Sequence, residues 1–141
     1  MSEKSLTISI KDIKLKQVDF QEIESRKNEK EIMEYTVDIP EDKIKNIDVG
    51  FQIKLFSEFE VHIDSTYVKG KVESRFVILD STKPVVKRLI KKQKYQLSFP
   101  IVAKICTLIA KVTEEMNAIP LVISPKDWIE MLEDEVEEDN E

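Results

Sequence analysis

The first half of the chain alternates apolar and polar residues with a period of two, which is typical of strands that bury one face. The first alternating segment begins at Leu6 and ends at Phe20, and its phase slips twice in between. A slip turns the apolar residues to the opposite face of a strand unless a bulge or a bend absorbs it. We therefore predict one long, bent strand, followed by three more over 35–39, 49–63 and about 67–79.

The second half of the chain changes to the helical period of 3.6. Pro84 suits the first turn of a helix that ends in a break around 95–98, and a longer helix begins near Phe99. Ser124 is placed to cap a last helix, which begins at Pro125. Four strands followed by helices predict an α+β fold, in which a four-stranded antiparallel sheet carries the C-terminal helices on one face.

The length of 141 residues suits one domain of ordinary size. We predict a single domain over 1–132 and an acidic, disordered tail over 133–141. The tail carries seven acids and no base, and removing these charges from the net charge of −6 leaves the body at +1. A body so close to neutral produces no strong field toward polyanions, so we expect no nucleic-acid partner.

One predicted helix is strongly basic, because residues 83–94 include six bases and no acid. Such a segment is either a solvated helix face or a contact for an acidic partner, RNA or anionic lipid. The chain opens without the apolar segment of a secretory signal, and it lacks an uninterrupted apolar run of about eighteen residues. We therefore expect a cytoplasmic protein that does not insert into a membrane.

Few residues are suited to catalysis or to metal binding. The only glycines, Gly50 and Gly70, are too far apart to form the glycine-rich loops that cradle phosphates. The only histidine, His62, and the only cysteine, Cys106, are too few for a structural zinc site. Cys106 lies among apolar helix residues, where burial makes a thiol unreactive. The sequence predicts no catalytic residue, metal or cofactor, and therefore no enzyme.

The segment 119–123 is unusual, because it joins two predicted helices with four large aliphatic residues, one proline and no charge. A connector of this kind has to be covered, or it exposes an apolar patch. Two interpretations remain open. The connector packs against the domain as a strand-like segment, or it lines an exposed apolar groove.

Three motifs resemble the SecB chaperone family. Residues 8–15 resemble the first strand of that family, with its Lys-Asp-Ile motif. Residues 97–100 resemble the Leu-Phe-Pro that opens its long helix, and residues 119–125 resemble its proline-flanked connector into the final helix. The order of the elements also agrees, from about Leu6 to Leu132.

This resemblance implies an ATP-independent holdase that binds unfolded or aggregation-prone polypeptides in an apolar groove. It also implies assembly as a dimer of dimers, and thus a homotetramer. The positions that match the groove of the family are Tyr35, Val37, Ile39, Phe99, Ile119, Leu121, Ile123 and Trp128. The long helix has more apolar residues than one sheet contact needs, so we predict an interface with another subunit at Ile101, Ile105, Leu108 and Val112.

Members of the family that serve export use acids on the sheet to dock the SecA motor. Asp12 matches one of these acids and is the motor-docking candidate, whereas Lys16 and Lys69 stand where others are expected. We therefore expect weak docking or none. Two alternatives to an export or general holdase stay open. One is a chaperone dedicated to the antitoxin of a toxin–antitoxin pair, and the other is a structural or adaptor module whose connector is fully buried.

Overall fold

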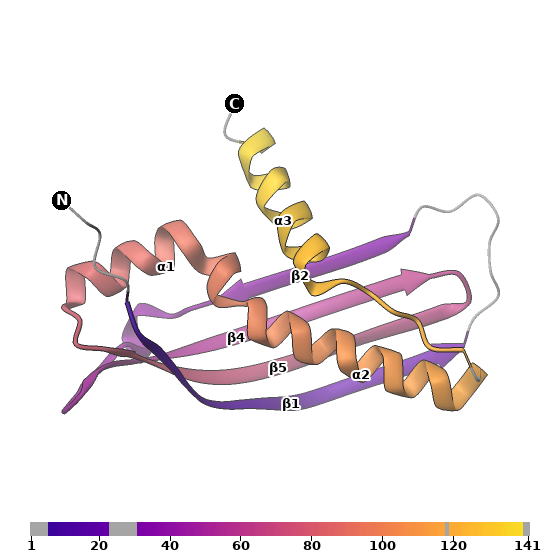
Figure 1. Cartoon of the computed structure of the whole chain (residues 1–141), viewed down its shortest axis with the longest axis horizontal. Helices are drawn as coiled ribbons and strands as arrows, with labels where there is room; N and C mark the ends of the chain where they lie inside the picture. The colour runs from indigo at the N-terminus through magenta and orange to yellow at the C-terminus, as the bar shows by residue number, and fades with distance from the viewer. Residues whose placement is uncertain (1–5, 23–30, 118, 140–141) are drawn as a thin grey trace.

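A single antiparallel sheet carries three helices on one of its faces (Figure 1). The computed structural model describes residues 6–22, 31–117 and 119–139. The sheet order is β1-β5-β4-β2, and the short strand β3 also pairs with β4. The elements are β1 (Ile8–Glu22), β2 (Ile32–Asp38), a 3-10 turn (Glu41–Lys43), β3 (Lys45–Ile47), β4 (Gly50–Ile63), β5 (Thr66–Leu79), α1 (Lys83–Leu97), α2 (Phe99–Asn117) and α3 (Pro125–Asp139).

The α+β class, the antiparallel sheet and the placement of the helices on one face are confirmed. The four predicted strands correspond to β1, β2, β4 and β5. The short strand β3 was not predicted, because three residues are too few to display a period of two.

Strand β1 absorbs both phase slips in bulges, as the sequence predicts. Its pairing with β5 shifts between Ile10 and Asp12, and again between Leu15 and Gln17, while β5 advances by one residue each time. One extra residue of β1 is therefore accommodated at each bulge. As a result, the apolar residues on either side of both bulges all lie on the helix side of the sheet.

The two faces of the sheet differ in character. On β4 and β5, alternate side chains such as Leu55 and Phe76 are buried beneath the helices. The side chains between them, such as those of the paired residues Glu58 and Lys71, point to the other side. We call this uncovered, mostly charged side the open face. The alternation explains why the sequence displays a period of two over this region.

The helices begin and end near the expected residues. The break between α1 and α2 falls at Ser98, whose buried hydroxyl donates a hydrogen bond to the carbonyl oxygen of Lys94 over 2.8 Å. At the start of α3, the Asp127 N–H donates to the Ser124 hydroxyl over 3.3 Å, which confirms the predicted cap. Pro84 lies in the first turn of α1.

The expectation of a disordered tail from residue 133 is wrong for the residues up to Asp139, because α3 continues to that residue. Glutamate has a high helix propensity, so an acidic run can extend a helix that packing has already nucleated. Figure 1 shows this part of α3 rising past the β2 edge of the sheet.

The helical region Lys83–Met116 is long and apolar enough to cross a membrane by length and composition alone. However, 44% of its most apolar window is buried inside the fold. The side chains of Ile101, Ile105 and Ile109 are fully buried and belong to the core. The apolar character of α2 therefore reflects its position over the sheet.

Candidate functional site

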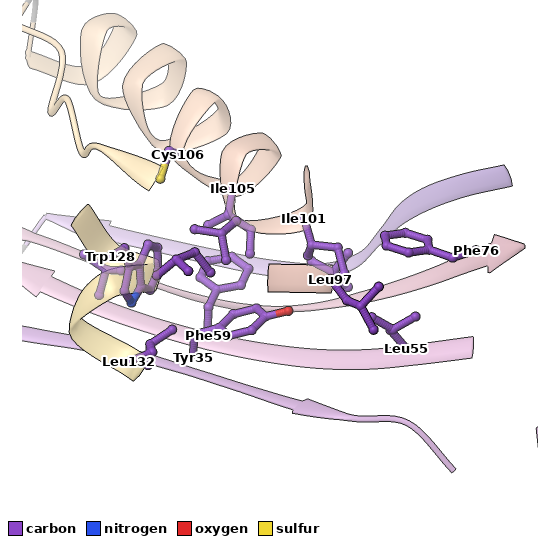
Figure 2. Close-up of a cluster of buried hydrophobic side chains, with 14 of the residues drawn as sticks. Tyr35, Leu55, Phe59, Phe76, Leu97, Ile101, Ile105, Cys106, Trp128 and Leu132 are labelled. Atoms are coloured by element: carbon purple, nitrogen blue, oxygen red, sulfur yellow. The ribbon is translucent and has the colours of Figure 1, made fainter. Parts of the chain in front are cut away.

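Two residues expected in a groove form the centre of the core instead. The side chains of Tyr35 and Trp128 are only 3% and 1% exposed. Their rings meet edge to face, with centroids 6.3 Å apart, and the Tyr35 hydroxyl shares a 2.9 Å hydrogen bond with the hydroxyl of Ser57. Figure 2 shows both rings among the other buried side chains. The expectation that Tyr35 and Trp128 line an open groove is therefore wrong for this conformation, because each ring fills the space beside the other.

The other expected groove residues on the sheet and on α2 are at intermediate positions. Val37 and Ile39 are half-buried and pack against the core from the β2 side. Phe99, at the start of α2, is exposed over 42% of its surface. Of these three residues, Phe99 is therefore the most exposed, and Val37 and Ile39 pack beside the buried Tyr35 cluster.

The connector 119–123 has an inner row and an outer row of side chains. Leu121 and Ile123 pack against the core, whereas Ile119 and Val122 are 76% and 77% exposed. The backbone N–H of Leu121 donates to the Thr113 hydroxyl over 2.7 Å, and this fixes the inner row against α2. The inner row thus packs against the domain, as one of the two interpretations expects, and the outer row is exposed to solvent.

Two of the four predicted subunit-contact residues are buried inside their own chain. Ile101 and Ile105 have essentially no exposed surface, so they cannot contact another subunit in this conformation. They lie on the stripe of α2 that faces the sheet. Leu108 and Val112 are half-buried. The interface prediction is therefore wrong for Ile101 and Ile105, because the stripe of α2 to which they belong already packs against the sheet of its own chain.

A groove that the sequence did not reveal runs between β1 and α2. It consists of two hollows that share no lining residue, one of about 270 Å³ at the α1–α2 junction and one of about 50 Å³ further along α2. The lining of the first is Ile8, Ile10, Phe76, Gln93, Gln96, Leu97 and Pro100, and that of the second is Ile13, Leu15, Val72, Ile101, Lys104, Ile105 and Leu108. We call these two hollows together the β1–α2 groove.

The β1–α2 groove has an apolar floor and partly exposed apolar walls. Its floor is formed by buried residues such as Phe76, whereas Ile10 and Leu15 on the β1 wall are 47% and 41% exposed. The alternation within 8–15 predicted an apolar face for this strand. The missing information was the sheet order, which places β1 at the edge and leaves this face only partly covered.

One charged residue crosses the groove. Lys104 on α2 donates from its Nζ atom to the carbonyl oxygen of Ile13 on β1 over 2.8 Å. Because β1 is an edge strand, its outer backbone groups have no neighbouring strand among the residues that the structure describes. A lysine at such an edge opposes pairing with a further strand, since its charge and long side chain have to be displaced first.

The open face carries a set of ion pairs instead of an apolar surface. Arg75 donates hydrogen bonds to the Asp12 carboxylate, including one of 2.8 Å from its Nε atom. This hydrogen bond lowers the pKa of Asp12 below its usual range. Glu73 lies between Lys16 at 3.8 Å and Lys54 at 3.7 Å. Asp12, the motor-docking candidate, is thus on an accessible face but already paired with a base.

Cys106 and His62, the only cysteine and the only histidine of the chain, both pack against other side chains of the fold. Burial raises the pKa of the Cys106 thiol to about 11, which keeps it protonated and unreactive at neutral pH. The His62 ring lies edge to face with Tyr67, with centroids 5.9 Å apart. In the described part of the chain, His, Cys, Asp and Glu side chains do not gather in a group of three that suits a metal ion.

Comparisons with known proteins identify solved structures that resemble this chain. No family model matches the chain, and no curated protein matches its sequence. A solved protein of unknown function from Streptococcus agalactiae matches 86% of this chain and 99% of its own, with a TM-score of 0.64 and 14% identity. A SecB-like chaperone from Mycobacterium tuberculosis was solved in complex with a ChAD peptide from the HigA1 antitoxin. Its match covers 83% of this chain and 89% of its own, with a TM-score of 0.49 and 11% identity. The first of these likenesses shows a shared fold.

Proposed function

We propose that this chain is an ATP-independent holdase chaperone that binds unfolded or aggregation-prone polypeptides. The observation that carries this proposal is the β1–α2 groove, which leaves large aliphatic side chains partly exposed along an edge strand. The exposed outer row of the connector adds a second apolar surface at the far end of α2. The sequence resemblance to SecB supports the same function.

The groove suits extended polypeptides of varied sequence for two physical reasons. Apolar contacts are not directional, and each aliphatic side chain that a client covers completely contributes roughly 1.5–3 kcal/mol. In addition, an edge strand offers backbone groups with which an extended client can pair irrespective of its side chains. Such binding needs no nucleotide, and release follows from the modest strength of each contact.

The proposal is tested by light scattering from a chemically denatured client that is diluted into buffer. We expect suppression of aggregation at a several-fold excess of this protein, equally with and without ATP. The double variant Ile10→Ser with Leu15→Ser removes two partly exposed groove side chains, and suppression should weaken. Val49→Ser is the matched control, because Val49 is 53% exposed but lies outside the groove and the connector. Absence of suppression by the wild-type protein contradicts the proposal.

The range of clients distinguishes a general holdase from a dedicated one. Polypeptides that co-purify with the protein should be numerous for a general or export holdase. A single dominant partner, such as an antitoxin, would instead show a dedicated chaperone. If an apolar dye fails to bind the native protein, a structural or adaptor module explains the fold better.

A further inference from the structure

Helix α1 carries a continuous basic half that has no acidic partner in the described part of the chain. The basic face, as we call it, comprises Lys83, Lys87, Arg88, Lys91 and Lys92, together with Lys94, which follows the non-helical Gln93 and has its Nζ atom 5.0 Å from the centre of the Tyr95 ring. These residues cover one half of the helix, opposite the buried residues Val86 and Leu89. None of the six lies within 4 Å of a described carboxylate oxygen.

This arrangement is unfavourable for an isolated helix. Lys83, Lys87 and Lys91 follow one another at intervals of four residues, as do Arg88 and Lys92. Like charges at this spacing repel each other on a helix surface. No acid in the first turn offsets the positive end of the helix dipole. The basic face therefore carries an electrostatic cost that a negatively charged partner would relieve.

Helix α3 shows the same problem with the opposite sign. Its first half is fixed to the core through Trp128, Ile129 and Leu132. From Glu130 to Asp139 it carries seven acids and no base, and no base stands in its last turn. Acids at the C-terminal end of a helix are repelled by the dipole as well as by each other. This acidic half thus needs positive charge as much as the basic face needs negative charge.

The chain does not satisfy these two needs internally among its described residues. Helices α1 and α3 pack against each other, but Figure 1 shows the acidic half of α3 rising past the sheet while α1 lies along it. The ion pair of α3 that the structure records is the local one between Lys126 and Glu130, at 4.0 Å. Within this acidic half, which we call the acidic arm, the side chains of Asp134 and Glu135 are exposed.

We propose that the acidic half of α3 docks on the basic face of α1 in a second copy of this chain. The exchange is reciprocal, because each copy offers one arm and one basic face, and a two-fold axis satisfies both contacts at once. The chain's own complementary helix is the observation that favours a second copy over RNA or lipid. This interface is independent of the chaperone proposal, and it uses neither the groove nor the buried stripe of α2.

The test is a charge swap followed by light scattering coupled to size exclusion. Wild type should have at least twice the mass of one chain at about 0.1 M salt and should dissociate at about 1 M, where the Debye length falls to about 3 Å. Each reversed contact changes affinity by up to about fivefold, so Lys87→Glu with Lys91→Glu should raise the dimer Kd by roughly tenfold or more. Asp134→Lys with Glu135→Lys should do the same.

Mixing the two charge-reversed variants should restore a mixed assembly. The reversed, acidic α1 of one variant then meets the reversed, basic α3 of the other, and the second contact of the pair has the charges of the wild type. The control is Lys43→Glu with Lys45→Glu, which makes the same change of charge on the 3-10 turn and on β3 instead of on α1 or α3, and should leave the mass unchanged. Circular dichroism confirms that each variant is folded. A monomeric wild type at low salt, a mass that the reversals leave unaltered, or a monomer that binds RNA or anionic vesicles through the basic face overturns the proposal.

Discussion

Lys104 bridges two elements of the molecule by donating a hydrogen bond from its Nζ atom to the backbone oxygen of Ile13, 2.8 Å away. The bond joins α2 to the edge strand β1 across the proposed client groove. The lysine is exposed, so its hydrogen bond contributes little to the free energy of unfolding. Its position suggests a role in access to the groove.

We predict that Lys104→Ala increases holdase activity. The change removes a charge from an otherwise apolar hollow and frees the edge of β1 for a client strand. The protein excess needed for half-maximal suppression of aggregation should fall by a few fold, while the free energy of unfolding changes by less than about 0.5 kcal/mol. Lys111→Ala on the same helix lies outside the groove and serves as the control. Weaker suppression by Lys104→Ala would show that the lysine itself contacts clients.

Thr113 should be the residue that holds the connector in place. Its buried hydroxyl accepts the Leu121 N–H over 2.7 Å and donates to the carbonyl oxygen of Ile109 over 2.7 Å. Thr113→Val keeps the shape but leaves the Leu121 N–H without its acceptor, at a cost of about 1–3 kcal/mol. Hydrogen exchange at Leu121 should accelerate accordingly. Thr107→Val, which removes an exposed hydroxyl bonded within α2, should leave this exchange rate nearly unchanged.

The stability of the protein should fall at alkaline pH because of Tyr35. Burial raises the pKa of its phenol, so the folded state keeps the proton at a pH at which the unfolded state releases it. The contribution of Tyr35 is fully present below the unfolded pKa of about 10 and is lost as the pH rises above it. Urea unfolding between about pH 8 and pH 11 measures this loss. The decline should be shallower in Tyr35→Phe, and an equal decline would assign it to other groups.

Gly70 occupies a position on β5 that no side chain can fill. A Cβ atom there would lie 2.5 Å from the carbonyl oxygen of Gln17 and 2.8 Å from the ring of Phe59. Gly70→Ala should therefore destabilise the fold by about 1–3 kcal/mol, because the neighbouring backbone of β1 has to move. Urea unfolding provides the measurement. Lys69→Ala, at the adjacent exposed position, should cost far less, and an equally mild effect of Gly70→Ala would contradict the close packing of β1 on β5.

Binding to a SecA tail should be weak, because the open face presents bases beside its remaining acid. Arg75 already engages Asp12, and Lys16 and Lys69 replace expected acids on the same face. The double change Lys16→Glu with Lys69→Glu should strengthen binding of the basic tail peptide by roughly tenfold or more. Titration calorimetry measures the affinity of the wild type and of the double variant for the peptide. Tight binding by the wild type that the double change leaves unaltered would refute this account of the open face.

The sequence predicted the local structure well, because period and turn chemistry are local properties. The two bulges of β1, the break at Ser98 and the Ser124 cap all follow from residues close together in the chain. The positions of Tyr35 and Trp128 did not follow, since an apolar alternation is the same for a residue in the core and for one in an open groove. Only the packing of α3 on β2 decides between the two.

The location of the groove depends on the sheet order, which is a non-local property. A period of two identifies the apolar face of β1 but contains no information on which strand lies at the edge. The acidic run was misjudged for a related reason. Its charges predict exposure correctly at Asp134 and Glu135, but the anchor that Trp128 and Leu132 provide for α3 allows the segment to remain helical up to Asp139.

The two bulges of β1 make this strand a regular alternating strand with two single-residue insertions. Lys11 and Lys16 are the extra residues, and both side chains are exposed. Removing either one leaves every remaining residue of β1 on its present face and opposite its present partner. Deletion of Lys14 would instead turn the following residues over. Evolutionary change in the length of this strand should therefore concentrate at positions 11 and 16, where an insertion or a deletion alters the bend of the sheet edge without altering the core.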